Sequence, residues 1–221
     1  MEHTPTLLSL NTGRPAALVL PHGLTRSAIV KAPVAGPLEL TANGLESDEQ
    51  ADRRVHGGPD KAVCVYPFDH YRYWRDRLGR ELEPGAFGEN FTTSGLLETE
   101  VCIGDTYGVG DAVVQVSQPR SPCYRLAANH NRPDMVKWVV STGYTGFYLR
   151  TLRPGTVEPG DRITLLSRST PSVTVARTNA VTYAARPSEA DVTAVLESPG
   201  LASTWREALE DRLRRLSRAS Q

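Results

Sequence analysis

Three polar segments of the sequence contain side chains that could do chemistry. The candidates lie in 53–61, with Arg53, His56 and Lys61, in 85–93, with Glu89, Asn90 and Thr92, and in 118–125, with Arg120, Ser121 and Cys123. Each segment is rich in turn-forming residues and lies next to a predicted strand. Loops at strand ends can meet at one mouth of a barrel. We therefore expect these segments to assemble a thiol, an imidazole, cations, a carboxylate and an amide around one small ligand.

Cys123 has the most distinctive surroundings of these candidates. Two prolines restrict the backbone just before it, and Arg120 places a cation nearby. A nearby cation favours the thiolate, which is the form that attacks electrophiles and binds metals. The alternative is that the side chain packs inward as a small hydrophobe. The other two cysteines, Cys64 and Cys102, lie in short apolar runs, and we interpret both as core residues.

Several common functional motifs are absent from the sequence. Gly108-Val109-Gly110 lacks the third glycine of a dinucleotide-binding fingerprint, and the chain has no phosphate-binding Gly-Lys-Ser or Gly-Lys-Thr loop, no Cys-x-x-Cys and no His-Glu-x-x-His. No Gly-x-Ser-x-Gly elbow marks a nucleophilic serine. The sequence thus argues against the common nucleotide, zinc and serine-hydrolase sites.

Composition narrows the possible partners. The chain has 221 residues, with 25 Lys and Arg against 25 Asp and Glu, so its formal net charge is zero. That balance disfavours a polyanion-binding protein. The mean hydropathy is −0.34, no apolar run approaches the length of a membrane span, and residues 1–10 lack the features of a secretory signal. We expect a cytoplasmic protein with no nucleic-acid or membrane partner.

The elements expected to position the polar segments are mainly strands. Short, roughly alternating apolar runs bounded by turn residues predict strands at 7–10, 28–30, 38–40, 62–66, 101–103, 112–116 and 162–166. Two inserted helices are predicted, one from Pro67 to Gly79 and one from Asp134 to Gly143, and we interpret both as packing helices. Many short strands favour a barrel, since closure removes exposed edges.

The sequence changes character after about residue 167. Apolar residues at helical spacing predict three helices, around 173–184, 189–196 and 202–218, with Arg186-Pro187 and Pro199-Gly200 between them. We therefore predict a mainly β fold in two domains: a β-barrel-like domain with inserted helices at 1–168 and a small three-helix domain at 169–221.

One ordered set of motifs is highly specific when taken together. The motifs are Val55-His56-Gly57-Gly58-Pro59-Asp60-Lys61, Tyr66-Pro67, Phe87-Gly88-Glu89-Asn90, Gly104-Asp105 and Gln115-Val116-Ser117-Gln118-Pro119-Arg120-Ser121-Pro122-Cys123-Tyr124. They resemble the YiiM group of MOSC-domain proteins, a family named after the C-terminal domain of molybdenum-cofactor sulfurases. The resemblance covers about residues 7–168, and the remainder is similar to the three-helix tail of that group. It implies a β-barrel-like fold, a molybdenum-pterin cofactor and a metal-ligating cysteine, which here is Cys123.

The cofactor that this resemblance implies carries a phosphate and a flat, hydrogen-bonding pterin. A pocket for it needs cations, amides and hydroxyls, and the candidates with these groups are Arg53, Lys61, Asn90, Thr92, Arg120 and Ser121. A thiolate at Cys123 suits a metal that the pterin sulfurs already hold. For Arg120 and Lys61, a solvated cation on a turn is an equal alternative. Asn90 could instead form an Asx-turn.

His56 and Glu89 have other expected roles. With an unperturbed pKa of about 6.5, His56 could donate a proton to a departing hydroxyl, or it could cap its own turn. For Glu89 we favour a supporting role over acid catalysis. Its carboxylate would hold the loop of Cys123 by accepting hydrogen bonds from backbone N–H groups.

The resemblance also suggests an activity, because some members of the group reduce N-hydroxylated bases and similar compounds. It implies a molybdenum-dependent oxidoreductase that converts such a substrate to the amine. No flavin or iron–sulfur motif occurs in the sequence, so an external electron-donating reductase is the expected partner, and the resemblance implies a homodimer. Two alternatives remain. One is a carrier of sulfur or of the intact cofactor with a persulfide on Cys123, and the other is an interaction module that uses the C-terminal helices.

Overall fold

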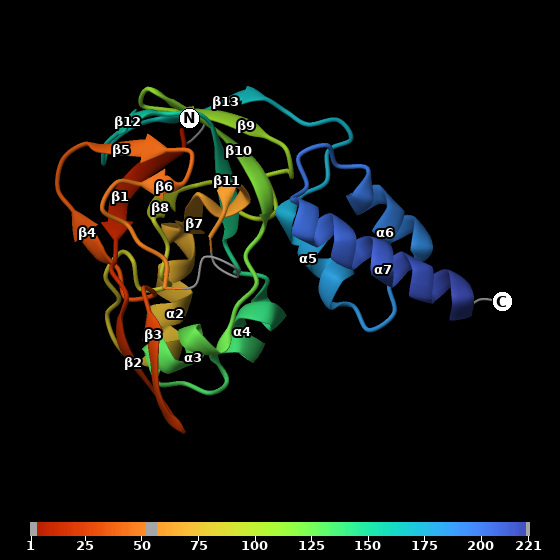
Figure 1. Ribbon diagram of the computed structural model, residues 1–221, viewed down its shortest axis with the longest axis horizontal. Coiled ribbons are helices and arrows are strands. Elements are labelled where there is room, and N and C mark those ends of the chain that lie inside the picture. Colours follow the sequence, from red (N-terminus) through yellow and green to blue (C-terminus); the bar gives the residue numbers. More distant parts are fainter. Residues whose placement is uncertain (1–3, 52–56, 220–221) are drawn as a thin grey trace.

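The computed structural model describes residues 4–51 and 57–219 (Figure 1). Two predicted site residues, Arg53 and His56, lie outside the described residues. The described part consists of a mainly β body followed by a group of helices at the C-terminal end (Figure 1). The predicted fold class is thereby confirmed.

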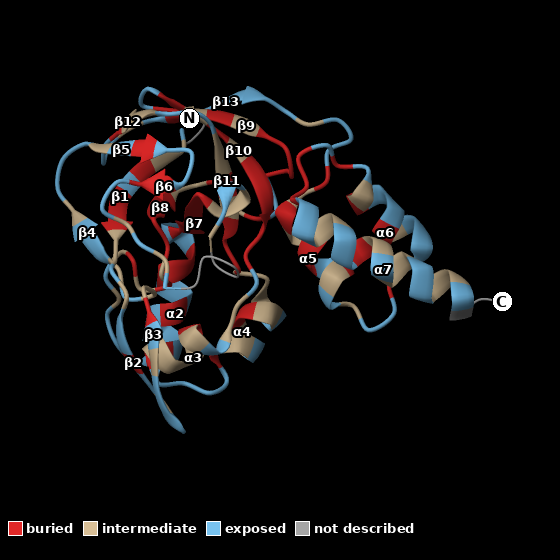
Figure 2. Ribbon diagram, in the orientation of Figure 1, coloured by how far each residue is buried: buried red, intermediate tan, exposed pale blue. Residues whose placement is uncertain are grey.

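An eight-stranded sheet forms the body. In spatial order its strands are β13 (Ile163–Ser167), β9 (Thr106–Val109), β10 (Ala112–Pro119), β11 (Phe147–Arg153), β7 (Val63–Pro67), β8 (Phe91–Ser94), β1 (Thr6–Thr12) and β4 (Ala32–Val34). Neighbouring strands are antiparallel except for β7 and β8, which are parallel. Burial is greatest in β7, β8 and β10 (Figure 2), and β10 is continuously buried from Val116 to Pro119. The helix α5 (Val175–Tyr183) packs against β10.

The sheet curls without closing into a complete barrel among the described residues. The start of β1 meets the start of β13 at a single bridge, between Thr6 and Arg162. Two backbone hydrogen bonds reinforce this contact, from Leu7 N to Asp161 O (2.9 Å) and from Ile163 N to Pro5 O (2.8 Å). The rest of that edge of β1 is occupied, since residues 10–12 pair with β4. Because β4 occupies this edge, the sheet is barrel-like, as predicted, and does not close among the described residues.

Two smaller sheets complete the β structure. One contains β12 (Gly155–Val157), β5 (Leu38–Thr41) and β6 (Gly44–Leu45), and Asn43 and Gly44 lie in the turn between the last two. The other is a hairpin of β2 (Ala16–Leu20) and β3 (Gly23–Ser27) that projects from the body at the bottom of Figure 1. The predicted strands at 28–30 and 101–103 are wrong: 28–30 is irregular, and Cys102 makes only an isolated bridge with Thr174.

The two predicted inserted helices are confirmed. A 3₁₀ turn, η2 (Phe68–His70), leads into α2 (Tyr71–Leu78), and α4 (Met135–Thr142) follows later. Both α-helices end on a left-handed glycine, Gly79 (φ 67°) and Gly143 (φ 75°), as the sequence predicts. A further helix, α3 (Tyr124–His130), starts directly after Cys123 and was not expected from the sequence.

Three C-terminal helices pack beside the sheet, at the right of Figure 1: α5, α6 (Glu189–Leu196) and α7 (Ser203–Ala219). Val181, Val192 and Leu209 from these helices belong to the same hydrophobic core as the sheet. Arg150 on β11 also links the two parts, since it donates to the backbone oxygen of Gly200 (2.9 Å). In the described part of the chain, no helix combines the length and the apolar character needed to cross a membrane.

Candidate functional site

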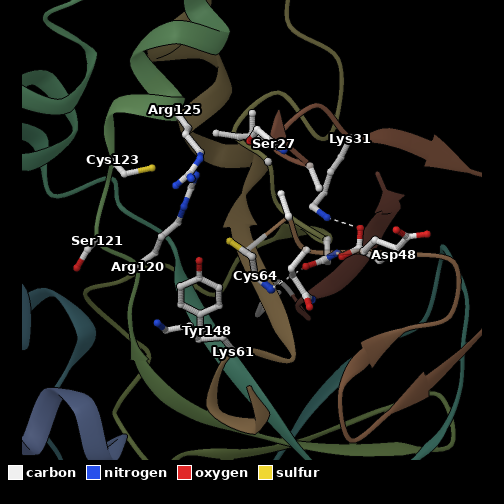
Figure 3. Close-up of a pocket in the computed structure, with 17 residues that line it drawn as sticks. Ser27, Lys31, Asp48, Lys61, Cys64, Arg120, Ser121, Cys123, Arg125 and Tyr148 are labelled. Carbon is white, nitrogen blue, oxygen red and sulfur yellow. Dashed lines mark hydrogen bonds and ion pairs between the residues drawn. The ribbon is translucent and has the colours of Figure 1, made fainter. Parts of the chain in front are cut away.

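The three candidate segments meet at one cavity beside β7, β10 and β11 (Figure 3). Their described members at the cavity wall are Lys61, Gly88, Asn90, Arg120, Ser121 and Cys123. The cavity opens to solvent, and the space between its walls, counted together with the solvent at its mouth, is about 690 Å³. The structure therefore brings the expected thiol, cations and amide together.

Cys123 occupies the point where β10 gives way to α3. The Pro-rich segment after β10 ends at this residue, which is extended (φ −129°, ψ 170°) and precedes the first turn of α3. Its thiol is free and only partly buried, and it faces the cavity (Figure 3). The alternative of an inward-packed core cysteine is therefore wrong for this residue.

Arg120 ties the cysteine-bearing loop to the loop at 85–88. It is buried, and its Nη2 donates to the backbone oxygen of Phe87. Burial works against the charge of this guanidinium, but its ionisable neighbours, of which Cys64 contributes most, outweigh burial and raise its pKa above the ordinary value. Arg120 is thus a fixed internal cation, and the alternative of a solvated turn residue does not apply.

Glu89 lies behind the cavity and does not reach it. Its fully buried carboxylate accepts hydrogen bonds from Gly85 N (2.9 Å), Phe87 N (3.0 Å), Thr92 Oγ1 (2.8 Å) and the Tyr71 hydroxyl. The expected backbone N–H donors are present, but they belong to the loop at 85–88, so the predicted contact with the Cys123 loop is wrong. Thr92 is also fully buried and does not line the cavity, which corrects its place in the predicted cofactor-binding set.

Asn90 uses its side chain to join two distant parts of the wall. Its Nδ2 donates to Asp48 Oδ2 (2.9 Å), and its Oδ1 accepts from Cys64 N (3.1 Å). Asp48 in turn forms a buried ion pair with Lys31 and accepts from Gly13 N (2.8 Å). Asn90 is therefore a wall-building residue and does not form an isolated Asx-turn. Nothing in the sequence near Lys31 or Asp48 marks either residue as part of this site.

Cys64 and Tyr148 form the floor of the cavity between β7 and β11. These residues are opposite each other in the sheet, and both line the cavity. Cys64 is thus a cavity residue as well as a buried one, which corrects its interpretation as a simple core residue. Burial, opposed mainly by Arg120, raises the pKa of the Cys64 thiol to about 11, so this thiol stays protonated at neutral pH.

Lys61 is the last residue of a short 3₁₀ turn, η1 (Pro59–Lys61), and lies at the edge of the cavity. Burial lowers the pKa of the Lys61 amine, although Asp60 opposes this effect. Asp60 anchors the turn, because it accepts from Arg150 Nε (2.9 Å) while its backbone oxygen accepts from Ser117 Oγ. The motif at 55–61 and the motif at 115–124 are thus joined by a direct hydrogen bond, from Ser117 Oγ to the backbone oxygen of Asp60.

Ser121 lies at the rim of the cavity. It is exposed and lines the cavity, and it partly offsets the rise that burial causes in the pKa of the Tyr183 phenol on α5. The cavity wall is also rich in cations: Lys31, Lys61, Arg120 and Arg125 line it together with the two carboxylates of Asp48 and Glu49. Such a wall suits a ligand that carries a phosphate.

The side chains at the cavity suit a metal whose other ligands come from a cofactor. Among the residues that the structure describes, no group of three or more His, Cys, Asp or Glu is placed to hold an ion. The Cys123 thiol is a soft ligand open to the cavity, and the cations beside it suit an anionic cofactor. The described residues therefore fit a molybdenum-pterin cofactor better than a metal ion bound by protein ligands alone.

Comparisons with known proteins give a consistent assignment. The MOSC domain model matches residues 52–164, and a model described as a YiiM-like, 3-alpha helix domain matches residues 173–216. YflK of Bacillus subtilis (strain 168) is 43% identical over 96% of both chains. The crystal structure of YiiM from Geobacillus stearothermophilus superimposes with a TM-score of 0.81 at 39% identity, covering 95% of this chain and 99% of the other.

A third relative is longer. A protein of Gibberella moniliformis (strain M3125 / FGSC 7600) named "Reductase" is 39% identical over 76% of this chain, which corresponds to only 30% of the fungal protein. On this evidence the chain belongs to the MOSC-domain family, in the YiiM-like branch that carries a three-helix domain after the MOSC domain.

Proposed function

We propose that this protein binds a molybdenum-pterin cofactor in the cavity, with Cys123 as the protein ligand of the metal, and reduces N-hydroxylated bases or related compounds. The observation that carries the proposal is the partly exposed Cys123 thiol on a cationic cavity in a chain of the MOSC family. Arg120 and Lys61 would bind the phosphate of the cofactor, with Ser121 at the rim. Asn90 would hold the wall in place, since both of its amide atoms are already hydrogen-bonded.

The proposed reaction is R–NHOH + 2 e⁻ + 2 H⁺ → R–NH₂ + H₂O. The N–O bond breaks, the nitrogen is reduced, and the oxygen leaves as water after it takes up protons. The bound cofactor supplies two-electron chemistry and an acceptor for the substrate oxygen. The chain itself orients the substrate, keeps the cations in place and limits the access of water. His56, which lies outside the described residues, remains our proposal for a proton donor.

Electrons would come from a separate reductase. The fungal relative named "Reductase" supports this part of the proposal, because the matched region is only 30% of that protein and leaves room for further domains. We also propose a cytoplasmic location, since the three cysteines are free thiols, as is usual in a reducing compartment. A homodimer remains a prediction from the family resemblance.

Metal content and turnover test the proposal together. The protein is purified from a molybdenum-competent host as wild type, Cys123→Ser and Cys102→Ser, the last being a buried cysteine away from the cavity. Bound molybdenum and reductant-driven conversion of an N-hydroxylated base are then measured for each. We expect both in wild type and Cys102→Ser, and a loss of turnover in Cys123→Ser. Metal-free wild type that carries labile sulfur would instead support the carrier alternative.

A further inference from the structure

Tyr148 places a phenol hydroxyl in the cavity that neither the sequence motifs nor the cofactor assignment uses. It lies on β11, opposite Cys64 on β7 and Gln118 on β10. Figure 3 shows its hydroxyl directed into the space between Arg120 and Cys64. Three adjacent strands therefore place this hydroxyl on the same cavity as the Cys123 thiol.

The surroundings of this residue limit where its hydroxyl can point. Its backbone oxygen accepts from Ser117 Oγ (3.1 Å), which also binds the backbone of Asp60. The phenol lies beside Arg120 (Figure 3), and Arg120 itself is anchored on the backbone oxygen of Phe87. A guanidinium has only donors, so the phenol must direct its hydrogen away from Arg120. Here that direction is the cavity.

The hydroxyl is also a permanent donor. Burial raises the pKa of the Tyr148 phenol above its ordinary value, and Arg120 only partly offsets this. The phenol therefore keeps its hydrogen at any physiological pH. Within the described part of the chain its hydrogen has no protein acceptor, so it is available to a ligand.

The groups around the Tyr148 hydroxyl indicate which kind of acceptor it would bind. Lys31 is held by Asp48, and both amide atoms of Asn90 are engaged, so these groups belong to the wall. The guanidinium of Arg120 suits an anion. A neutral hydroxyl donor suits a neutral acceptor, and the oxygen of an N–OH group is one. We propose that Tyr148 is a substrate-binding residue whose hydroxyl donates a hydrogen bond to the oxygen of the N–OH group.

This inference rests on the proposed function, and binding measurements test it separately from turnover. Cofactor-loaded protein is titrated with N-hydroxyadenine, in which the exocyclic amine carries the hydroxyl, and with adenine, which lacks that oxygen. We expect wild type to bind the hydroxylated base more tightly. Tyr148→Phe keeps the ring and loses only the donor, so the preference should fall about 2- to 10-fold, as for one neutral hydrogen bond. Its affinity for adenine and its molybdenum content should not change.

Tyr124→Phe is the matched control, because Tyr124 is next to Cys123 but exposed and outside the cavity wall. It should keep the wild-type preference. If Tyr148→Phe also keeps that preference while wild type reduces the substrate, the inference is refuted and the proposed function stands. If Tyr148→Phe loses affinity for both bases or loses metal, Tyr148 supports the site generally and the inference is wrong. If wild type neither holds molybdenum nor binds the hydroxylated base, the proposed function fails and the inference fails with it.

Discussion

Replacing Glu89 with glutamine should destabilise the protein through the loop that supports the cavity. The Oε1 atom of Glu89 accepts from the Tyr71 hydroxyl, Gly85 N (2.9 Å) and Thr92 Oγ1 (2.8 Å), and its Oε2 atom accepts from Phe87 N (3.0 Å). Glutamine has nearly the same size, but one of its two end groups is an NH₂ that only donates. At least one buried donor must therefore lose its acceptor.

The expected cost follows from that lost acceptor. A hydrogen bond to a charged group contributes about 1.5–3 kcal/mol, and a buried donor without a partner costs about 1–3 kcal/mol. Because Glu89 is fully buried, solvent does not reduce these values. We expect Glu89→Gln to lower the free energy of unfolding by about 2–4 kcal/mol, measured by urea denaturation at pH 7. Glu83→Gln, an exposed residue of the same segment, should change it by less than about 0.5 kcal/mol.

Two results would refute this reasoning. A loss below about 0.5 kcal/mol in Glu89→Gln would show that the buried hydrogen bonds contribute little, contrary to the general rule for such groups. An equal loss in Glu83→Gln would show that the segment responds to any change of charge. In either case, we would have to abandon the inference that Glu89 holds Phe87 in place and, through Phe87, Arg120.

Three further predictions concern other groups. Alkylation of native protein at pH 8 should modify Cys123 rapidly and Cys64 slowly, because Cys64 is buried and its pKa is raised to about 11; mass spectrometry of the peptides measures both rates. Burial and Arg80 lower the pKa of His130 from 6.5 to about 4, so the unfolded chain takes up the proton first. The contribution of neutral His130 to the free energy of unfolding is therefore fully present above pH 6.5, and up to about 3 kcal/mol of it is lost as the pH drops towards 4. His130→Gln should remove this part of the pH dependence, as measured by urea denaturation. Arg150→Ala removes donors to Asp60, Gln115 and the backbone of Gly200, and thermal unfolding should show a loss of about 2–4 kcal/mol.

Matched variants control these predictions. His22 is exposed, so His22→Gln should leave the pH dependence as in wild type, and an equal effect of both histidine variants would contradict the assignment to His130. Arg153 on the same strand is exposed, and Arg153→Ala should cost less than about 1 kcal/mol. Equal losses in the two arginine variants would argue against Arg150 as the link between the domains. Equal alkylation rates at the two cysteines would contradict the buried position of Cys64.

Features with a local cause were predictable from the sequence. Gly79 and Gly143 end their helices in the left-handed conformation, and both helices were predicted from the residues at their ends. The three C-terminal helices were likewise visible from apolar spacing and from the Pro and Gly residues between them. The exposed hairpin of β2 and β3 was missed, because burial within these strands does not alternate regularly.

Features that depend on contacts between distant segments were harder to predict from the sequence. Asp48 reaches the site through Asn90, which is 42 residues away, so no local pattern marks it. Cys64 lies in a strand that is buried at every position, and a continuous apolar run does not show which side chain faces a cavity. Tyr148 has the same difficulty, since its role comes from Arg120 and from the register of β11 with β7. Motif resemblance identified the loops, but only the fold shows which side chains form the wall.

The bond between molybdenum and the sulfur of Cys123 is the central claim, and X-ray absorption spectroscopy at the molybdenum edge tests it most directly. The sample is protein from a molybdenum-competent host, as wild type and as Cys123→Ser, with spectra taken from whatever metal each retains. The account predicts that the variant has one sulfur neighbour fewer around the metal than wild type. The same number of sulfur neighbours in both proteins would contradict it.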